Sequence, residues 1–317
     1  MNDEDRPRTS AALWGWSVFT IAWALLLLFA GAAVTTTRSG DAIPTWPEPL
    51  FPRDFSTPAL IEWTHRGVAA WMGIFTLVLA AWTQRREKSR PRVRHLGWSL
   101  VALVLVQAVV GGLRVLFVAD GIDATPTWLK VLHAVTGQAF FCALVAHSTV
   151  LAPSWRKAVR RDLDPAAMGV MRGAILSLVL LLVQLVLGAL ARHGVVAREV
   201  HAFFALVPLV VVARLVLVGS FDVAVRAHEI RRAASLLGVL AAAQIALGLV
   251  TYFVAATGGA PEQRTPTQVV LVNLHLAVGA AMLGTTLSIL MRAVHVFGVP
   301  TDERVEAAER AASGSAS

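Results

Sequence analysis

The stretch LVQAVVGGLRVLFVA, Leu105–Ala119, is an apolar run with only a few polar positions, among them Gln107. It lies in a longer apolar segment, and an α-helix needs about 20 such residues to cross the hydrocarbon core of a bilayer. Hydrophobic residues make up 56% of the 317 positions and charged residues 15%, whereas soluble domains have roughly 45–50% and 25%. The sequence therefore predicts an integral membrane protein.

Eight apolar segments of this length can be counted between polar breaks, and they predict an all-α protein with eight transmembrane helices. The segments are 11–34, 58–83, 96–118, 127–151, 168–191, 199–220, 233–256 and 267–291. The first has a longer apolar part than a signal peptide and no small-residue cleavage site after it, so we expect it to be retained. The tail 301–317 is mostly polar and small, which predicts disorder.

The net charge of +8 raises the question of a nucleic-acid partner, but the basic residues gather in alternate connections. These are Arg85, Arg86, Lys88, Arg90, Arg92 and Arg94 in the second, Arg156, Lys157, Arg160 and Arg161 in the fourth, and Arg226, Arg231 and Arg232 in the sixth. Basic connections face the cytoplasm. We therefore expect both termini on the cytoplasmic side of a bacterial-type cell membrane, contact with membrane lipid and no nucleic-acid partner.

The chain repeats itself, and the repeat predicts two halves. LVQAVVGGLRVLFVA is matched by AAAQIALGLVTYFVA, 241–255, and each is followed by a span that begins with a histidine motif, LHAVTG at 132–137 and LHLAVG at 274–279. AGAAVTTTRSG, 30–40, and LGALARHG, 187–194, match more loosely. We predict two pseudo-symmetric four-helix bundles, an N-terminal half at 1–155 and a C-terminal half at 165–300.

Four histidines lie near the predicted outer ends of the even-numbered spans, one in each: His65, His133, His201 and His275. Ionisable groups inside a bilayer are costly and mark functional sites. Two imidazoles from facing helices can hold a haem iron from both sides, so we predict the pairs His65 with His133 and His201 with His275. Gly137 and Gly279, which follow His133 and His275 by one turn, would leave room for the edge of the macrocycle.

Two other functions compete with the haem interpretation. Zinc or copper prefers three or four imidazole or thiolate ligands at one point, whereas the repeat divides the histidines into pairs and the only cysteine is Cys142. A proton-coupled transporter would use the histidines with Glu62. The remaining histidines lie at span ends or in connections, where we expect them to be solvated. Gln107, Gln184 and Gln244 each precede a glycine by four residues, which suits close helix packing or a place near a buried ligand.

Glu62 lies one turn before His65 in the motif IEWTHR, 61–66, and shares a helix face with both His65 and Arg66. An ion pair with Arg66 accounts for Glu62 without any function. If His65 binds a haem iron, Glu62 lies at the porphyrin rim, where a carboxylate can handle protons or stabilise a developing cation. The matching REVHAFFA places Glu199 two residues before His201, which is not on the same face. The halves therefore differ at this position.

The order of motifs TRSGDAIPTWP, IEWTHR, QAVVGGLRV, LHAVTGQAFF, QLVLGALARHG, VHAFFA and NLHLAVG resembles the heme A synthase family. Members oxidise a methyl group of haem O to the formyl group of haem A for cytochrome oxidase assembly. The resemblance implies that His201 and His275 hold a haem b cofactor, His65 and His133 hold the substrate haem O, and Glu62 is the catalytic carboxylate. It also implies an electron donor and a haem O synthase as partners.

The first outer loop departs from the pattern of many members. Ile43 and Pro49 stand where those members have cysteines, and Thr45 stands where they have an aspartate. Any thiol-disulfide step in that loop is therefore absent. The short third outer loop, ARHGVVAREVH, covers the C-terminal site less well. These departures fit a cysteine-less subgroup, and they also fit a relative that binds haem for electron transfer or haem delivery without catalysis.

Overall fold

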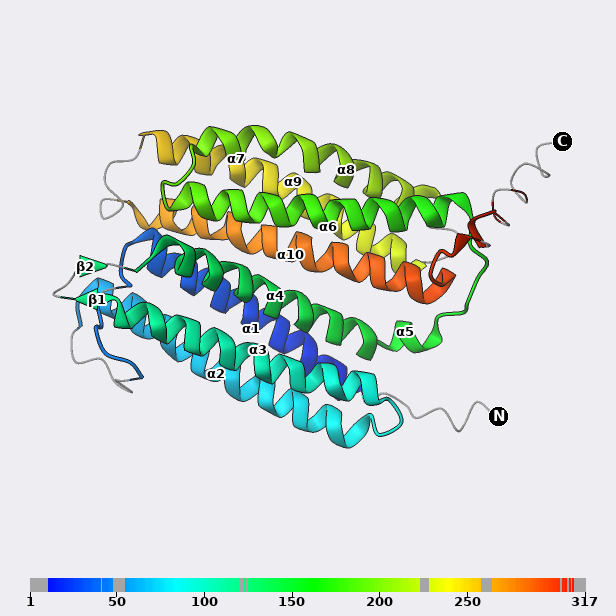
Figure 1. Cartoon of the computed structure of the whole chain (residues 1–317), viewed down its shortest axis with the longest axis horizontal. Coiled ribbons are helices and arrows are strands. Elements are labelled where there is room, and N and C mark those ends of the chain that lie inside the picture. Colours follow the sequence, from blue (N-terminus) through cyan, green and yellow to red (C-terminus); the bar gives the residue numbers. More distant parts are fainter. Residues whose placement is uncertain are drawn as a thin grey trace. The chain divides into compact units, whose positions relative to one another are not determined.

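A computed structural model describes residues 11–40, 42–47, 55–119, 122–123, 125–222, 228–257, 264–302, 304–306, 308 and 310. Its helices are α1 (Ala11–Thr36), α2 (Thr57–Arg86), α3 (Pro91–Leu116), α4 (Thr127–Leu151), α5 (Pro153–Lys157), α6 (Pro165–Arg192), α7 (Arg198–Phe204), α8 (Leu206–Leu217), the π-helix η2 (Val218–Asp222), α9 (His228–Thr257) and α10 (Pro266–Phe297) (Figure 1). Two strands, β1 (Val118–Ala119) and β2 (Ile122–Asp123), form a minimal antiparallel hairpin.

Eight helical spans in this part of the chain are long and apolar enough to cross a membrane, and each coincides with a predicted segment. The predicted all-α membrane fold is therefore confirmed. The tail predicted to be disordered lies mostly outside the described residues.

Proline and a capping aspartate explain where several helices begin. Pro91, Pro165 and Pro266 are each the first residue of a helix, a position where the missing N–H of proline has no partner to lose. The Asp164 carboxylate also accepts a hydrogen bond from the backbone N–H of Ala167 at 2.7 Å, which caps α6.

The sixth span is less regular than the sequence predicted. It is divided at Ala205 into α7 and α8 and then passes into the π-helix η2. Pro208 lies in the first turn of α8 and has no N–H to donate to the carbonyl of Phe204 four residues earlier, so the hydrogen-bond ladder is interrupted there. The apolar run continues through this break, which is why hydrophobicity alone predicted one continuous helix.

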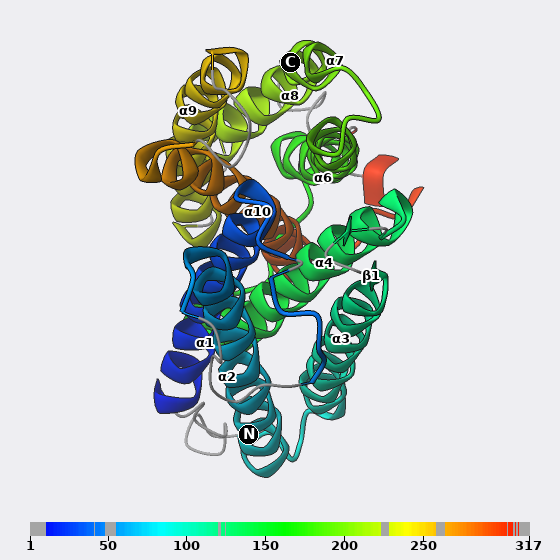
Figure 2. The same ribbon diagram turned by 90° about the vertical axis from the view of Figure 1, so that its left-hand side faces the viewer.

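The chain forms two compact units. The first comprises the described residues of Met1–Leu151 and Ala246–Ala280. Its helices α1 to α4 run side by side, as both views show (Figures 1 and 2). The beginning of α10 joins this unit through Thr36, whose hydroxyl donates to Oδ1 of Asn273 at 2.8 Å.

The interior of the first unit combines apolar and small polar side chains. Met72, Leu79, Leu100 and Leu144 are fully buried, and the Ser17 hydroxyl donates to Ser148 Oγ at 2.9 Å. His147, expected to be solvated at a span end, is instead fully buried, with Nε2 3.3 Å from Thr83 Oγ1. That expectation was wrong because α4 is covered by its neighbours where His147 lies.

The second unit comprises the described residues of Ala152–Ile245 and Ala281–Ser317. One apolar core joins α6, α8, α9 and the later part of α10 through Val170, Met171, Leu215, Ile230 and Ile289. The boundaries between the units fall inside α9 and α10. The predicted halves 1–155 and 165–300, in contrast, follow the sequence repeat. The two pseudo-symmetric bundles stay a prediction.

The predicted orientation can be tested with single cysteines in a Cys142→Ala background. Ser89 and Val159 are exposed and lie in predicted cytoplasmic connections, whereas exposed Val195 lies in a predicted outer one. In intact cells an impermeant thiol reagent should label Val195→Cys and leave Ser89→Cys and Val159→Cys unlabelled until the cells are opened. The reverse labelling pattern would invert the topology.

Candidate functional site

His65 and His133 each pack their imidazole ring against a glycine of the preceding odd-numbered span. A Cβ atom at Gly31 of α1 would lie 2.9 Å from Cε1 of His65, and one at Gly111 of α3 would lie 3.2 Å from Cε1 of His133. No side chain larger than hydrogen fits between ring and helix at Gly31 without movement. Both histidines belong to the first unit, and in each of them Nδ1 is buried and has no hydrogen-bond partner among the described residues.

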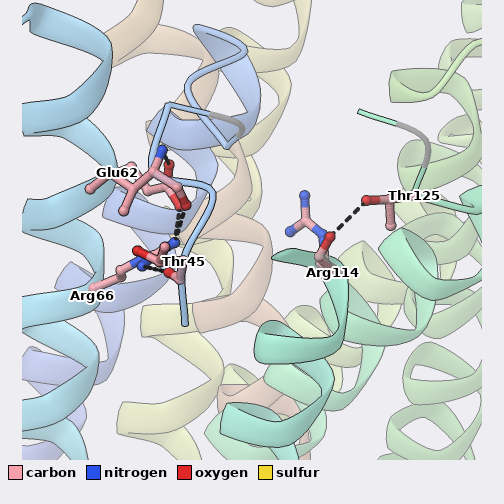
Figure 3. Close-up of polar contacts among 6 residues, drawn as sticks. Thr45, Glu62, Arg66, Arg114 and Thr125 are labelled. Carbon is pink, nitrogen blue, oxygen red and sulfur yellow. Dashed lines mark hydrogen bonds and ion pairs between the residues drawn. The ribbon is translucent and has the colours of Figure 1, made fainter. Parts of the chain in front are cut away.

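The structure brings these two histidines together with a cation that the sequence analysis did not single out. His65 and His133 are close enough to interact electrostatically, and Arg114 interacts with both. Arg114 lies in the last turn of α3, and the Thr125 hydroxyl donates to its backbone carbonyl at 3.1 Å (Figure 3). Both histidines of one predicted pair therefore lie in one unit, and their role as a ligand pair stays a prediction. The sequence did contain a signal for Arg114, because an arginine inside an apolar segment commonly marks a functional site.

His201 and His275 repeat the same local arrangement, each within its own unit. A Cβ atom at Gly188 would lie 2.9 Å from Cε1 of His201 in the second unit, and one at Gly248 would lie 3.1 Å from Cε1 of His275 in the first. The loose match between 30–40 and 187–194 thus acquires a physical meaning, because it aligns Gly31 with Gly188.

Two of the three glutamines that precede these glycines support the histidine backbone. Gln107 Nε2 donates to the carbonyl of His133 at 2.7 Å, and Gln184 Nε2 donates to the carbonyl of His201 at 2.9 Å. Gly137, expected to leave room for a macrocycle edge, instead lies against Gln107, whose Nε2 would be 2.9 Å from a Cβ there. These two glutamines therefore hold the backbone turn that carries a histidine.

A glycine substitution tests whether this packing positions the ring. In Gly31→Ala the added methyl group would overlap His65, so the ring or α1 must shift, and overpacking of this kind costs about 1–3 kcal/mol. We expect Gly31→Ala to retain less haem than the parent protein, as measured by pigment extraction. The melting temperature, measured on the same samples, should change little. Gly73→Ala is the matched control because nothing lies within 4 Å of its Cβ position. Equal haem content in both variants would contradict the positioning role.

Glu62 is buried, with 4% of its surface exposed, and each carboxylate oxygen has a partner (Figure 3). Oε2 accepts from the backbone N–H of Ile43 at 2.9 Å, and Oε1 accepts from Nη2 of Arg66 at 2.5 Å. The guanidinium of Arg66 also donates to the carbonyls of Ile43 at 2.8 Å and Thr45 at 2.6 Å. The predicted Glu62–Arg66 pair exists, but it is largely buried and holds the segment 42–47 that follows α1.

The clamped loop also contacts α3. Trp46 covers Gly112, where a Cβ would lie 2.6 Å from Cε2 of the indole. Ile43, which stands at a cysteine position of the family pattern, is itself buried and is held at both its N–H and its carbonyl. Polar contacts from α2 thus fix the loop in a sequence that has no cysteine there. Pro49, at the second cysteine position, lies outside the described residues.

Comparison with known proteins identifies relatives over part of the chain. The model of a family described as "Cytochrome oxidase assembly protein" matches residues 48–197, which include Glu62, His65 and His133. A protein named heme A synthase from Shouchella clausii (strain KSM-K16) is 36% identical over 104 residues, 32% of this chain and 35% of the relative. One of the same name from Lysinibacillus sphaericus (strain C3-41) is 36% identical over 97 residues, 29% and 32% of the two chains.

A third protein named heme A synthase, from Roseobacter denitrificans (strain ATCC 33942 / OCh 114), is 27% identical over 134 residues, 38% of this chain and 33% of the relative. The matches thus span about a third of the length of these curated relatives. These partial matches agree with the resemblance predicted from the motifs. Over residues 48–197 the chain is similar to the family of cytochrome oxidase assembly proteins, and over about a third of its length it is similar to proteins named heme A synthase.

Proposed function

We propose that this protein is a heme A synthase, which oxidises a methyl group of haem O to the formyl group of haem A within the membrane for cytochrome oxidase biogenesis. The observation that carries the proposal is that His65 and His133, which come from α2 and α4 of one unit, each pack the imidazole ring against a glycine and each have a buried Nδ1 without a hydrogen-bond partner among the described residues. The partial matches support the reaction, because the family model covers residues 48–197 and relatives over about a third of the chain are named heme A synthase.

The residues present fit a haem as substrate at this place. Imidazole nitrogen is a good ligand for haem iron, and helical bundles present such ligands from facing helices. Both rings have a buried Nδ1 without a hydrogen-bond partner among the described residues, and both lie against glycine. We assign His65 and His133 as the residues that hold haem O. Arg114, whose charge acts on both histidines, is suited to pair with its propionate carboxylates.

The cofactor proposal concerns haem b, held by His201 and His275. It rests on the sequence repeat and on the equivalent glycine contact that each histidine makes within its own unit. Haem b at this place would relay electrons. Gln184 holds the carbonyl of His201 and so fixes the turn from which the ring projects.

Glu62 is proposed as the catalytic carboxylate. It lies one turn from His65, is buried, and is oriented by Ile43 N–H and Arg66. A fixed carboxylate next to the reacting methyl group would take up a proton or stabilise positive charge that develops there. A haem O synthase that supplies the substrate is one partner this reaction requires. Conversion of methyl to formyl removes four electrons, so the reaction also requires an oxidant, which is either an electron acceptor or dioxygen used together with the proposed electron donor.

Pigment analysis tests the proposal directly. The full chain is expressed in cells that make haem O but lack their own heme A synthase, and extracted haems are separated by chromatography. We expect haem A in these cells and none in cells without the chain. If haem b is bound to the protein but haem O passes unchanged, the protein is instead a haem-binding electron carrier or delivery protein.

A further inference from the structure

A groove that the haem chemistry does not use lies in the second unit, between α5, the segment that follows it and the end of α10. It encloses about 400 Å³ and is lined by Trp155, Arg160, Leu290, Met291, Val294, His295, Gly298 and Val299. Figure 1 shows α5 next to the C-terminal end of α10. The backbone N–H of Arg161 donates to the carbonyl of Val296 at 2.9 Å, which joins the two segments directly.

One wall of the groove is a fixed aromatic surface. The rings of Trp155 and His295 are stacked with centroids 4.0 Å apart and an interplanar angle of 12°. His295 Nε2 lies 2.9 Å from the carbonyl of Trp155. Arg292 donates to Ser154 Oγ at 3.1 Å and so ties α10 to α5. The groove is therefore built from residues that hold one another and does not depend on a loose loop.

The lining is apolar towards one end and cationic towards the other. Leu290, Met291 and Val294 lie on adjacent turns of one face of α10. Arg160 is exposed at the groove, and the structure gives its guanidinium no acidic partner in the described part of the chain. The segment PSWRKAVRR, 153–161, adds further basic residues and contains no acidic residue. This combination suits a ligand with a negatively charged head and an apolar tail.

The length of α10 places the groove at the border of the membrane. The helix has 32 residues, about 48 Å at 1.5 Å per residue, whereas the hydrocarbon core is about 30 Å thick. Because the apolar segment of this span ends near residue 291, we expect the last turns of α10 to reach the headgroup region. Leu290 and Met291 then lie beside acyl chains while Arg160 and His295 lie at the depth of phosphate groups, and tryptophan is favoured at the same depth.

We infer that this groove is a binding site for one anionic diacyl phospholipid, with its phosphate on Arg160 and an acyl chain along Leu290, Met291 and Val294. Basic pockets between helices at a membrane surface recognise anionic headgroups in this way. Neutral phospholipid lacks the net charge that Arg160 would bind, and a free phosphate lacks the chain that would fill the apolar part.

Native mass spectrometry of the purified full-length protein, after reconstitution with equal phosphatidylglycerol and phosphatidylcholine, tests this site. We expect phosphatidylglycerol to be retained preferentially through delipidation. Arg160→Gln should lower its retention about fivefold, the factor that corresponds to one basic residue near an anionic surface. Met291→Trp, which fills the apolar part and keeps every charge, should lower it at least as much. Because Arg160 is exposed, its substitution leaves the packing of the unit intact.

Arg86→Gln is the matched control, since Arg86 is also an exposed arginine at a predicted cytoplasmic helix end but lies in the first unit. It should leave lipid retention unchanged. The site is overturned if both phospholipids are retained equally, or if Arg86→Gln lowers retention as much as Arg160→Gln does. It is also overturned if inorganic phosphate displaces the lipid, which would indicate a simple anion site, or if an acidic peptide does so, which would indicate a protein partner.

Discussion

His201→Ala and His275→Ala should each remove the low-spin bis-imidazole spectrum of haem b from the purified protein. Loss of a residue that merely supports a metal ligand costs about 10–100-fold in affinity, so loss of the axial ligand itself should exceed that factor. The fold should survive in His201→Ala, because Gln184 Nε2 keeps its 2.9 Å hydrogen bond to the backbone carbonyl of residue 201 and loses only a longer, 3.5 Å contact with Nε2 of the ring. The optical spectrum of equal amounts of purified protein measures the effect.

His95→Ala is the appropriate control, since His95 is exposed at the beginning of α3 and far along the helix from the predicted outer end. Its spectrum should equal that of the parent. If the low-spin signal survives in both His201→Ala and His275→Ala, haem b is held elsewhere. If it is lost only in one, the two histidines do not share one iron.

The sequence predicted the helices well, because a membrane span is recognised from the summed hydropathy of about 20 residues. That sum is insensitive to one residue, which is why it did not detect the break before Pro208 or the short helix α5 after Leu151. It also ended the last span at 291, whereas α10 continues to Phe297. Polar side chains such as Arg292 and His295 stop an apolar run but do not stop a helix, and they make tertiary contacts there instead.

The sequence could predict a member of the candidate site only where the residue type itself was unusual for a membrane span, as histidine is. Four histidines in matching positions could be recognised, and the glutamine pattern marked three of the four glycines. The contact between each glycine and a histidine ring could not be predicted, because Gly31 and His65 meet through the packing of two helices. The same holds for Arg114, which lies near two histidines from other helices. The clamp of Ile43 by Glu62 could not be expected either, since it joins a loop backbone to a helix across 19 positions.

The clamp gives Glu62 two possible contributions to activity. One is chemical, through its carboxylate near His65. The other is structural, because the carboxylate and Arg66 hold Ile43 and Thr45 in the segment that follows α1. The side chains of Glu62 and Arg66 are 5% and 18% exposed, so the low worth of an exposed ion pair, about 0–1 kcal/mol, does not apply. Removal of one partner from a buried pair can cost about 3–5 kcal/mol.

Glu62→Gln should stop the conversion of haem O while haem b is retained. The amide keeps an oxygen for the N–H of Ile43 and keeps the size of the side chain, but it cannot take up a proton or balance a positive charge. A carboxylate in acid–base catalysis commonly contributes about 10²–10⁴-fold in rate. Chromatography of extracted haems should therefore show accumulated haem O and a drop in haem A of at least about 100-fold.

Arg66→Lys separates the two contributions. It keeps the positive charge beside Glu62 but loses the two guanidinium nitrogens that donate to the carbonyls of Ile43 and Thr45. In a Cys142→Ala background, the rate at which Thr45→Cys reacts with an impermeant thiol reagent reports how firmly the loop is held. We expect Arg66→Lys to speed labelling while much of the haem A formation remains, and Glu62→Gln to abolish haem A with a smaller change in labelling. If haem A falls in parallel with loop release in both variants, Glu62 acts by holding the loop and is not the catalytic carboxylate.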